Sequence, residues 1–150
     1  MATYRPQKRI DGDSRMYTVA SGQTVRAGMG LKLAATDTAP ANSNYPQVQE
    51  AAADTDVIEA IAYSDDPAKT WAAGELVEGI FLQGEVTIPV LVGTGDMTRG
   101  LQVVAVSDGF TDAPAHGTGS RIYSPGVAVE TGTVGQWASI NVQKVALSKA

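Results

Sequence analysis

The chain contains no cysteine, and this absence excludes several kinds of chemistry. Disulfide staples, thiolate zinc sites, iron–sulfur clusters and cysteine nucleophiles all require a thiol. Histidine is almost absent too, because His116 is the single one in the sequence, so a transition-metal site would have one imidazole to draw on. We therefore expect no metal ion and no cofactor.

Long apolar runs are also missing. No stretch approaches the roughly 20 apolar residues that a bilayer-spanning helix needs. The first nine residues carry Arg5, Lys8 and Arg9 and lack the apolar core of a secretion signal. We expect a protein that folds in a cytoplasm and does not use a membrane.

Positive charge is scarce and unevenly distributed. The chain has 11 basic and 16 acidic residues, a net charge of −5, which argues against a nucleic-acid partner. Four of the basic residues lie in residues 1–15, whereas ten acidic residues lie between Asp37 and Glu85 with Lys69 as the one base among them. The pattern predicts a basic end and an acidic body.

The residues that could carry catalysis do not form a recognised pattern. His116 lies in a Pro- and Gly-rich stretch, residues 114–119, and no serine occupies a Gly-x-Ser-x-Gly elbow. The acids at 54, 56, 65 and 66 lack the alternating ligand spacing of a calcium loop, so we interpret them as solvated loop acids. A small hydrolase stays the least favoured hypothesis, and we expect no catalytic residue.

A glycine-rich stretch, residues 93–100, resembles a phosphate-binding loop at first sight. It lacks the Gly-Lys-Ser/Thr ending of such loops, and no helical pattern follows it whose N-terminal amides could hold an anion. We predict a loop between two strands.

Alternation with a period of two dominates what the sequence does contain. In residues 85–92, four aliphatic residues share one face, which is typical of a half-buried strand. Pro89 cannot donate to a sheet ladder, so this strand is predicted at an edge or a bulge. Similar short runs occupy residues 16–20, 31–35, 57–63, 76–82, 101–106, 126–130 and 137–142.

These runs predict an all-β fold, a small barrel or sandwich-like body of about eight short strands. The chain has 16 Gly and 7 Pro, and glycine-containing turns separate nearly all of the runs. Residues 36–47 and 107–119 are predicted to be exposed loops. One alternative is a helix within residues 48–62, because three consecutive alanines follow Glu50.

At 150 residues the chain suits one domain, which we place at residues 16–150, preceded by an extended N-terminal arm of residues 1–15. The arm has Ile10 as its one large aliphatic residue and cannot form a core by itself. Such a segment is either a plain terminus or a docking arm that becomes ordered on an acidic neighbour. Its candidate docking residues are Tyr4, Arg5, Lys8, Arg9 and Arg15.

Three stretches in order resemble the capsid decoration (cement) proteins of tailed bacteriophages. Residues 25–33 are similar to an early segment of that family in which an Ala-Gly turn leads into a strand. Residues 58–62 and 73–86 are similar to its strand, Ala-Gly-Glu turn and following strands. Residues 125–142 are similar to its ending. The matched stretches cover roughly a third of the chain.

The resemblance implies a structural virion protein without catalytic residues. Members of the family lie on the outer surface of an icosahedral head, commonly as trimers, and bridge subunits of the major capsid protein. The implied partners are that capsid protein and further copies of the chain, as a trimer or a dimer, after assembly in the host cytoplasm. The acidic stretch and the long stretch 107–119 depart from the commonest family pattern.

Aromatic residues leave two questions open. Tyr45, Trp71 and Tyr123 lie in or beside predicted loops, where exposed rings could stack on sugars, so the alternative function is a receptor- or glycan-binding module. Trp137 points away from Ala138 and Ile140 in its predicted strand. It packs either against a neighbouring subunit or on the far side of its own body.

Overall fold

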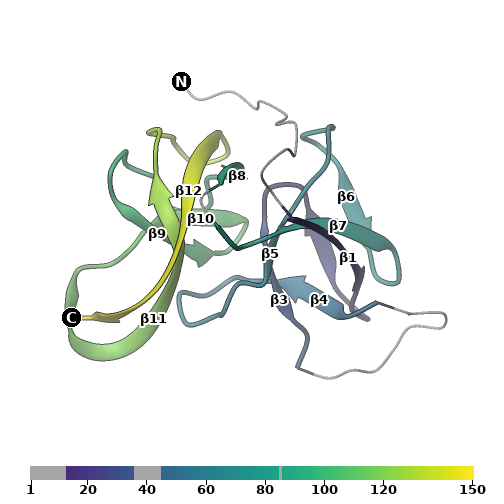
Figure 1. Ribbon diagram of the computed structural model, residues 1–150, viewed down its shortest axis with the longest axis horizontal. Helices are drawn as coiled ribbons and strands as arrows, with labels where there is room; N and C mark the ends of the chain where they lie inside the picture. Colours follow the sequence, from purple (N-terminus) through teal and green to yellow (C-terminus); the bar gives the residue numbers. More distant parts are fainter. Residues whose placement is uncertain (1–12, 36–44, 85) are drawn as a thin grey trace.

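The computed structural model describes residues 13–35, 45–84 and 86–150, which form twelve strands and no helix (Figure 1). The prediction of an all-β fold is confirmed. The strands are β1 (Asp13–Val19), β2 (Thr24–Arg26), β3 (Gly30–Leu33), β4 (Gln47–Glu50), β5 (Ala60–Ala62), β6 (Thr70–Ala72), β7 (Leu76–Phe81), β8 (Thr87–Leu91), β9 (Gln102–Val106), β10 (Gly109–Asp112), β11 (His116–Ala128) and β12 (Trp137–Lys149).

The first half of the chain forms a closed five-stranded barrel. Its strand order is β1-β4-β3-β5-β7, and β7 pairs back onto β1 in antiparallel fashion to close the ring. β1 and β4 run parallel, whereas the other neighbours in the barrel are antiparallel. β2 and β6 form a separate two-stranded ribbon. We call residues 13–84 the barrel half.

The second half forms a five-stranded sheet in the order β10-β9-β11-β12-β8. Its longest strands, β11 and β12, form a hairpin. Each has 13 residues, and together they curve around this side of the molecule (Figure 1). A bridge between Val92 and Phe110 joins the two edges at one end, where Gly93 N–H donates to Phe110 C=O over 2.7 Å. We call residues 86–150 the sheet half.

Pro89 occupies the position that its chemistry requires. β8 is an edge strand, and Pro89 stands opposite Ser139 of β12. The missing N–H of proline therefore costs no central ladder bond. The predicted edge position is confirmed.

One sequence-based expectation on local structure was wrong, and one alternative was not realised. The predicted loop 107–119 contains β10 and the beginning of β11, with Ser107 and Asp108 as a two-residue connection in which Asp108 has a φ of 66°. The beginning of β11 was concealed because residues 116–119 are exposed and need no apolar face, and β10 was concealed because Phe110 is its one large apolar residue. The alternative helix in residues 48–62 is likewise absent, since β4 and β5 occupy its ends.

The strand number also exceeds the expected eight. Each of the eight predicted runs overlaps a strand, but β2, β4, β6 and β10 were missed. They are three or four residues long, too short for alternation to become visible. Of the predicted loop 36–47, residues 36–44 lie outside the described residues, and Gln47 begins β4 as a buried residue.

The two halves share their hydrophobic cores. One cluster fills the barrel and includes Leu91 and Trp137, which come from the sheet half. The other fills the sheet half and includes Ile58 and Ile61 from the barrel half. Because each core needs residues from both halves, the halves stabilise one another.

Trp137 lies at the centre of this seam. Its side chain is 8% exposed and packs against Gly28, where an added Cβ would come within 2.5 Å of the indole ring. Gly28 also has a φ of +90°, and its C=O accepts a hydrogen bond from Leu91 N–H. Of the two roles considered for Trp137, the structure shows the packing within its own body.

Candidate docking surface

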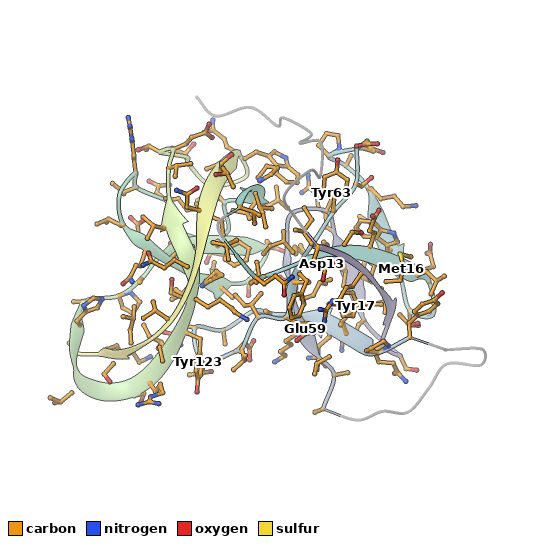
Figure 2. The ribbon with its side chains drawn as sticks, in the orientation of Figure 1. Asp13, Met16, Tyr17, Glu59, Tyr63 and Tyr123 are labelled. Carbon is orange, nitrogen blue, oxygen red and sulfur yellow. The ribbon has the colours of Figure 1, made fainter. Side chains whose placement is uncertain are left out.

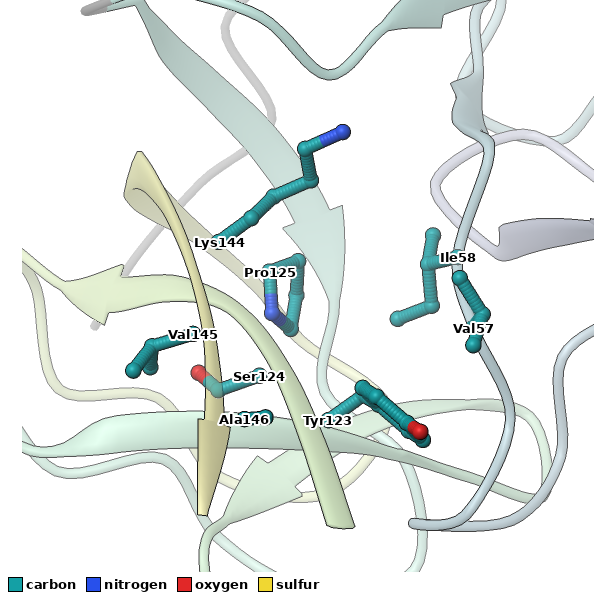
Figure 3. A pocket seen from close by; sticks show the side chains of 8 residues that line it. All are labelled: Val57, Ile58, Tyr123, Ser124, Pro125, Lys144, Val145 and Ala146. Carbon is teal, nitrogen blue, oxygen red and sulfur yellow. The ribbon is translucent and has the colours of Figure 1, made fainter.

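An open groove follows the seam between the halves. It encloses about 260 Å³ and is lined by Val57, Ile58, Tyr123, Ser124, Pro125, Lys144, Val145 and Ala146. Figure 3 shows Val57 and Ile58 on one side, with Pro125, Lys144 and Tyr123 of the hairpin across from them. Lys144 is the one charged residue in this lining.

Val57 gives the groove an exposed apolar wall. Its side chain is 62% exposed, the largest fraction among the exposed large hydrophobic residues of the described chain, whereas neighbouring Ile58 is 5% exposed and belongs to the core. An exposed aliphatic side chain fixed next to a buried one is held in place by the fold. Burying it against a partner would remove apolar surface from water at little further entropic cost.

The lower end of the groove is closed by contacts between the loop after β4 and the hairpin. Tyr123 N–H donates to Asp54 C=O over 2.9 Å, and Lys149 Nζ lies 3.3 Å from Asp54 Oδ2. The loop itself is held by Asp56, whose Oδ2 accepts from the N–H groups of Ala52 and Ala53. The chain thus fixes the distance between the two walls.

Asp56 is held in its ionised form. Burial alone would raise the pKa of its carboxyl, but the hydrogen bond from Lys32 Nζ at 2.8 Å and those from the two backbone N–H groups together lower the pKa. The carboxylate therefore stabilises the loop that carries Val57.

Two cationic side chains contact the ring of Phe81 next to the groove. The guanidinium carbon of Arg15 lies 3.6 Å from the centroid of the Phe81 ring, and Lys144 Nζ lies 5.5 Å from the same centroid. Both distances suit cation–π contacts. Arg15 also pairs with Asp13 over 3.2 Å. Phe81 therefore links the start of β1 to the groove residue Lys144.

Tyr17 and Glu59 lie near each other in the barrel half (Figure 2). Burial of the phenol, with the nearby carboxylate of Glu59 as the next cause, raises the pKa of Tyr17 to about 12. The Tyr17 hydroxyl and Glu59 Oε1 are 3.5 Å apart, a long contact.

The predicted docking arm is described only in part. Tyr4, Arg5, Lys8 and Arg9 lie outside the described residues. Arg15, by contrast, lies in β1, two residues after its start, and pairs in register with Gly79 of β7. The described part of the predicted arm, from Asp13 on, is a strand of the barrel.

Sequence reasoning missed Lys144 and Val57 as surface candidates. The predicted last strand stopped at residue 142, because Gln143 and Lys144 interrupt its apolar alternation. β12 nevertheless continues to Lys149, and the interruption marks the point where its side chains leave the core. Two polar residues inside an otherwise alternating strand were the available signal.

The three aromatic residues considered for sugar stacking have different environments. Trp71 is 6% exposed and belongs to the barrel core, so its ring does not offer a face to a sugar. Tyr45 is 44% exposed beside β4, and Tyr123 lies in β11 at the groove. Trp71 therefore does not offer the exposed ring that sugar stacking requires, because it is buried where the β2–β6 ribbon packs on the core of the barrel half.

His116 lies at the beginning of β11, exposed, beside a hollow of the sheet half. Neither a serine nor a carboxylate is among the residues that line this hollow: Gly100, Leu101, Gln102, Ala113, Pro114, Ala115, His116 and Val127. The glycine-rich stretch 93–100 is, as predicted, a connection between two strands, β8 and β9. Within the described residues, no group of three or more His, Cys, Asp or Glu side chains could hold a metal ion.

Most acidic side chains of the barrel half have partners of their own. Glu50 accepts from Asp108 N–H over 2.8 Å, and its burial raises the pKa of its carboxyl. Asp65 accepts from the Tyr63 hydroxyl and Asp66 from Ala68 N–H. The acids thus fix turns and connect the halves, rather than being merely solvated. A helix capable of crossing a bilayer is not found among the described residues.

No protein-family model and no curated protein matches the sequence. Among solved structures, the chain is similar to one described as the head fiber gp8.5 N base in bacteriophage phi29. The match has a TM-score of 0.60 and 18% sequence identity, and it covers 87% of this chain and 93% of that chain. At this identity the likeness establishes a shared fold.

Proposed function

We propose that the protein is a structural virion protein of a tailed bacteriophage. It binds the outer surface of the icosahedral head and stabilises the expanded head by bridging subunits of the major capsid protein. The observation that carries this proposal is the fold, shared over 87% of the chain with the base of a phage head fiber. The resemblance of three sequence stretches to capsid decoration proteins supports it from a different direction.

The mechanism is linkage between binding and the state of the shell. A protein that binds the expanded shell and not its precursor stabilises the expanded state by its binding free energy. At a free concentration of 100 times the Kd this amounts to about 2.7 kcal/mol for each site. Repeated over the symmetric sites of a head, a modest contact resists internal pressure without a cofactor or a reaction.

The proposed docking surface combines the N-terminal arm with the end of the barrel from which it begins. Arg15 contacts Phe81 and pairs with Asp13 at the start of β1. Arg5, Lys8 and Arg9 each add a positive charge to the arm, and Tyr4 adds an aromatic ring. Charge of this sign favours an acidic patch on the capsid and speeds the encounter with it.

The test is co-sedimentation of the purified protein with expanded, emptied heads and with unexpanded procapsids of the phage that carries its gene. We expect saturable binding to expanded heads and at least tenfold weaker binding to procapsids. Absence of binding to expanded heads overturns the proposal.

The role of the arm requires two truncations, because β1 begins at Asp13. Deletion of residues 2–12 leaves β1 intact and is expected to weaken binding to heads without a change in thermal stability. Deletion of residues 2–15 also removes the β1 pairing from Asp13 to Arg15 and the Phe81 contact, and is expected to lower stability as well. Undiminished binding after deletion of residues 2–12 removes the arm from the proposal.

A homo-oligomer, favoured as a trimer with a dimer as the alternative, belongs to the same proposal. Decoration at a symmetric head site matches the symmetry of its binding partner most simply with a closed ring of copies. Native mass spectrometry of the free protein and of protein released from heads gives the copy number directly. A monomer in both samples contradicts the trimer.

A further inference from the structure

The groove at the seam is a second candidate binding surface, distinct in composition from the basic arm. Its walls are apolar, with Val57 exposed on one side and Pro125 and Val145 on the other. Its volume of about 260 Å³ lies below the roughly 300–1,000 Å³ typical of small-molecule sites. Dimensions of this kind suit a side chain that protrudes from a protein segment.

Lys144 sets the sign of charge that the groove accepts. The ion pairs of the described residues are Arg15–Asp13, Lys32–Asp56 and Lys149–Asp54, and none of them includes Lys144. The contact of its ammonium group is the Phe81 ring, 5.5 Å from Nζ to centroid. The acids at both ends of the groove, Asp13 and Asp54, already have cationic partners, so the uncompensated charge in the lining is positive.

From this combination we propose that the groove binds an extended segment of the major capsid protein that carries an apolar side chain next to a carboxylate. The apolar side chain lies between Val57 and Tyr123, and the carboxylate pairs with Lys144. The identity of the partner rests on the proposed function. The groove lies next to the start of β1, because Phe81 contacts both Arg15 and Lys144.

Three acids of the barrel half, Asp54, Asp56 and Glu50, are already held by hydrogen bonds or ion pairs within the chain. The crosslinking experiment below distinguishes a second copy of the chain from the capsid protein as the occupant of the groove.

The experiment measures the affinity of full-length variants for expanded heads. Val57→Asp places a carboxylate on the apolar wall, and Lys144→Glu reverses the charge that the partner meets. Matched controls are Val134→Asp, at a valine 58% exposed in the sheet half, and Lys69→Glu, at a lysine 5.9 Å from the ring of Trp71. We expect each groove variant to weaken binding about tenfold or more, and each control to change it less than threefold.

Thermal unfolding of each variant shows that the fold is retained. Should Lys144→Glu lower the melting temperature, Lys144→Gln removes the charge without reversing it and is expected to weaken binding by a smaller factor. If wild type binds heads and the groove variants bind equally well, the groove is not the docking site and the proposed function stands. If wild type itself does not bind heads, the proposed function fails.

Photo-crosslinking identifies the occupant. A benzophenone amino acid at position 57 is irradiated on bound heads, and the adduct is digested and sequenced by mass spectrometry. We expect an adduct with an acidic segment of the major capsid protein. An adduct with a second copy, or with residues 1–12 of the same chain, overturns the proposal, as does efficient binding with no adduct to the capsid protein.

Discussion

The barrel half and the sheet half are stabilised by different kinds of side-chain contact. The barrel half contains most of the acidic residues and uses them in bonds that fix turns, such as Asp56 with the N–H groups of Ala52 and Ala53. Its core includes the aromatic residues Tyr17 and Trp71. The sheet half relies on aliphatic strands and the long β11–β12 hairpin.

The difference shows where a binding surface arises. Neither half is complete without the other, because Trp137 enters the barrel core and Ile58 enters the core of the sheet half. The groove lies along this seam: one wall is held by Ile58, which is buried in the core of the sheet half, and the other wall belongs to the β11–β12 hairpin. Preorganised walls of this kind bind a partner with little loss of conformational entropy.

The largest expected effect separates the seam from the interior of one half. Trp137→Ala removes an 8% exposed indole from the contact between halves and is expected to destabilise the protein by about 3–5 kcal/mol. Trp71→Ala, at a tryptophan 6% exposed inside the barrel, is expected to cost a similar amount. Amide hydrogen exchange distinguishes them: Trp137→Ala lowers protection in both halves, whereas Trp71→Ala lowers it mainly in the barrel half. If both variants lose protection in the same regions, Trp137 does not couple the two halves.

The next largest effect is expected at Gly28, where the contact with Trp137 leaves no room for a side chain. An alanine there adopts a strained φ of +90° and meets both the Trp137 ring and Leu91 N at less than 3 Å, so Gly28→Ala is expected to cost about 2–4 kcal/mol. Gly22→Ala is the matched control, because Gly22 has a φ of +74° and open space around its Cα. Its cost of about 1 kcal/mol measures backbone strain alone. Urea unfolding gives both values, and equal costs contradict close packing at Gly28.

A smaller effect is expected at alkaline pH, where ionisation of Tyr17 in the barrel half lowers the free energy of unfolding. The pKa of Tyr17 is about 12 in the folded protein and 10.0 without the fold, so the folded state keeps a proton that the unfolded state loses. Stability is therefore complete below pH 10 and is lost as the pH rises through this window, by at most about 2–3 kcal/mol. Tyr17→Phe cannot lose this proton. Unfolding free energies at pH 9 and 11.5 should fall more steeply for wild type, and parallel curves contradict the assignment.

The smallest effect compares two ion pairs, one within the barrel half and one across the seam. Asp56→Asn removes the 2.8 Å contact with Lys32 and is expected to cost about 1 kcal/mol at neutral pH. Because the pKa of Asp56 is lowered, this contribution disappears as the pH falls below 3.8 and through the folded-state pKa. Lys149→Met, which removes the more exposed 3.3 Å pair with Asp54, is expected to cost about 0.5 kcal/mol or less. Thermal unfolding at pH 7 and pH 3 compares them, and an undiminished Asp56 effect at pH 3 contradicts the assignment.

Much of the fold was accessible from the sequence, because alternation and glycine turns act locally. The edge position of Pro89 followed from one missing N–H group, and each of the eight predicted runs overlaps a strand. Strands of three or four residues were not visible, since they are fixed by pairing with distant partners, as β2 is with β6. The β10 strand was concealed because its formation depends on pairing with β9.

The candidate surface was less accessible, for a physical reason. The groove joins Val57 to Lys144 and Tyr123, and the sequence gives no measure of contact between residues so far apart. The basic character of the arm is a local property and was therefore visible in the sequence. That Trp71 is buried in the core of the barrel half could be known only once β2 and β6 were paired.

The position of the protein on a head tests the proposed function most directly. A cryo-electron microscopy map of expanded heads saturated with the protein is expected to show density on the outer shell, at the boundaries between capsid subunits, with the groove and the start of β1 facing the capsid. Density that contacts the shell only through the opposite face, or an undecorated shell at saturating protein, would contradict it.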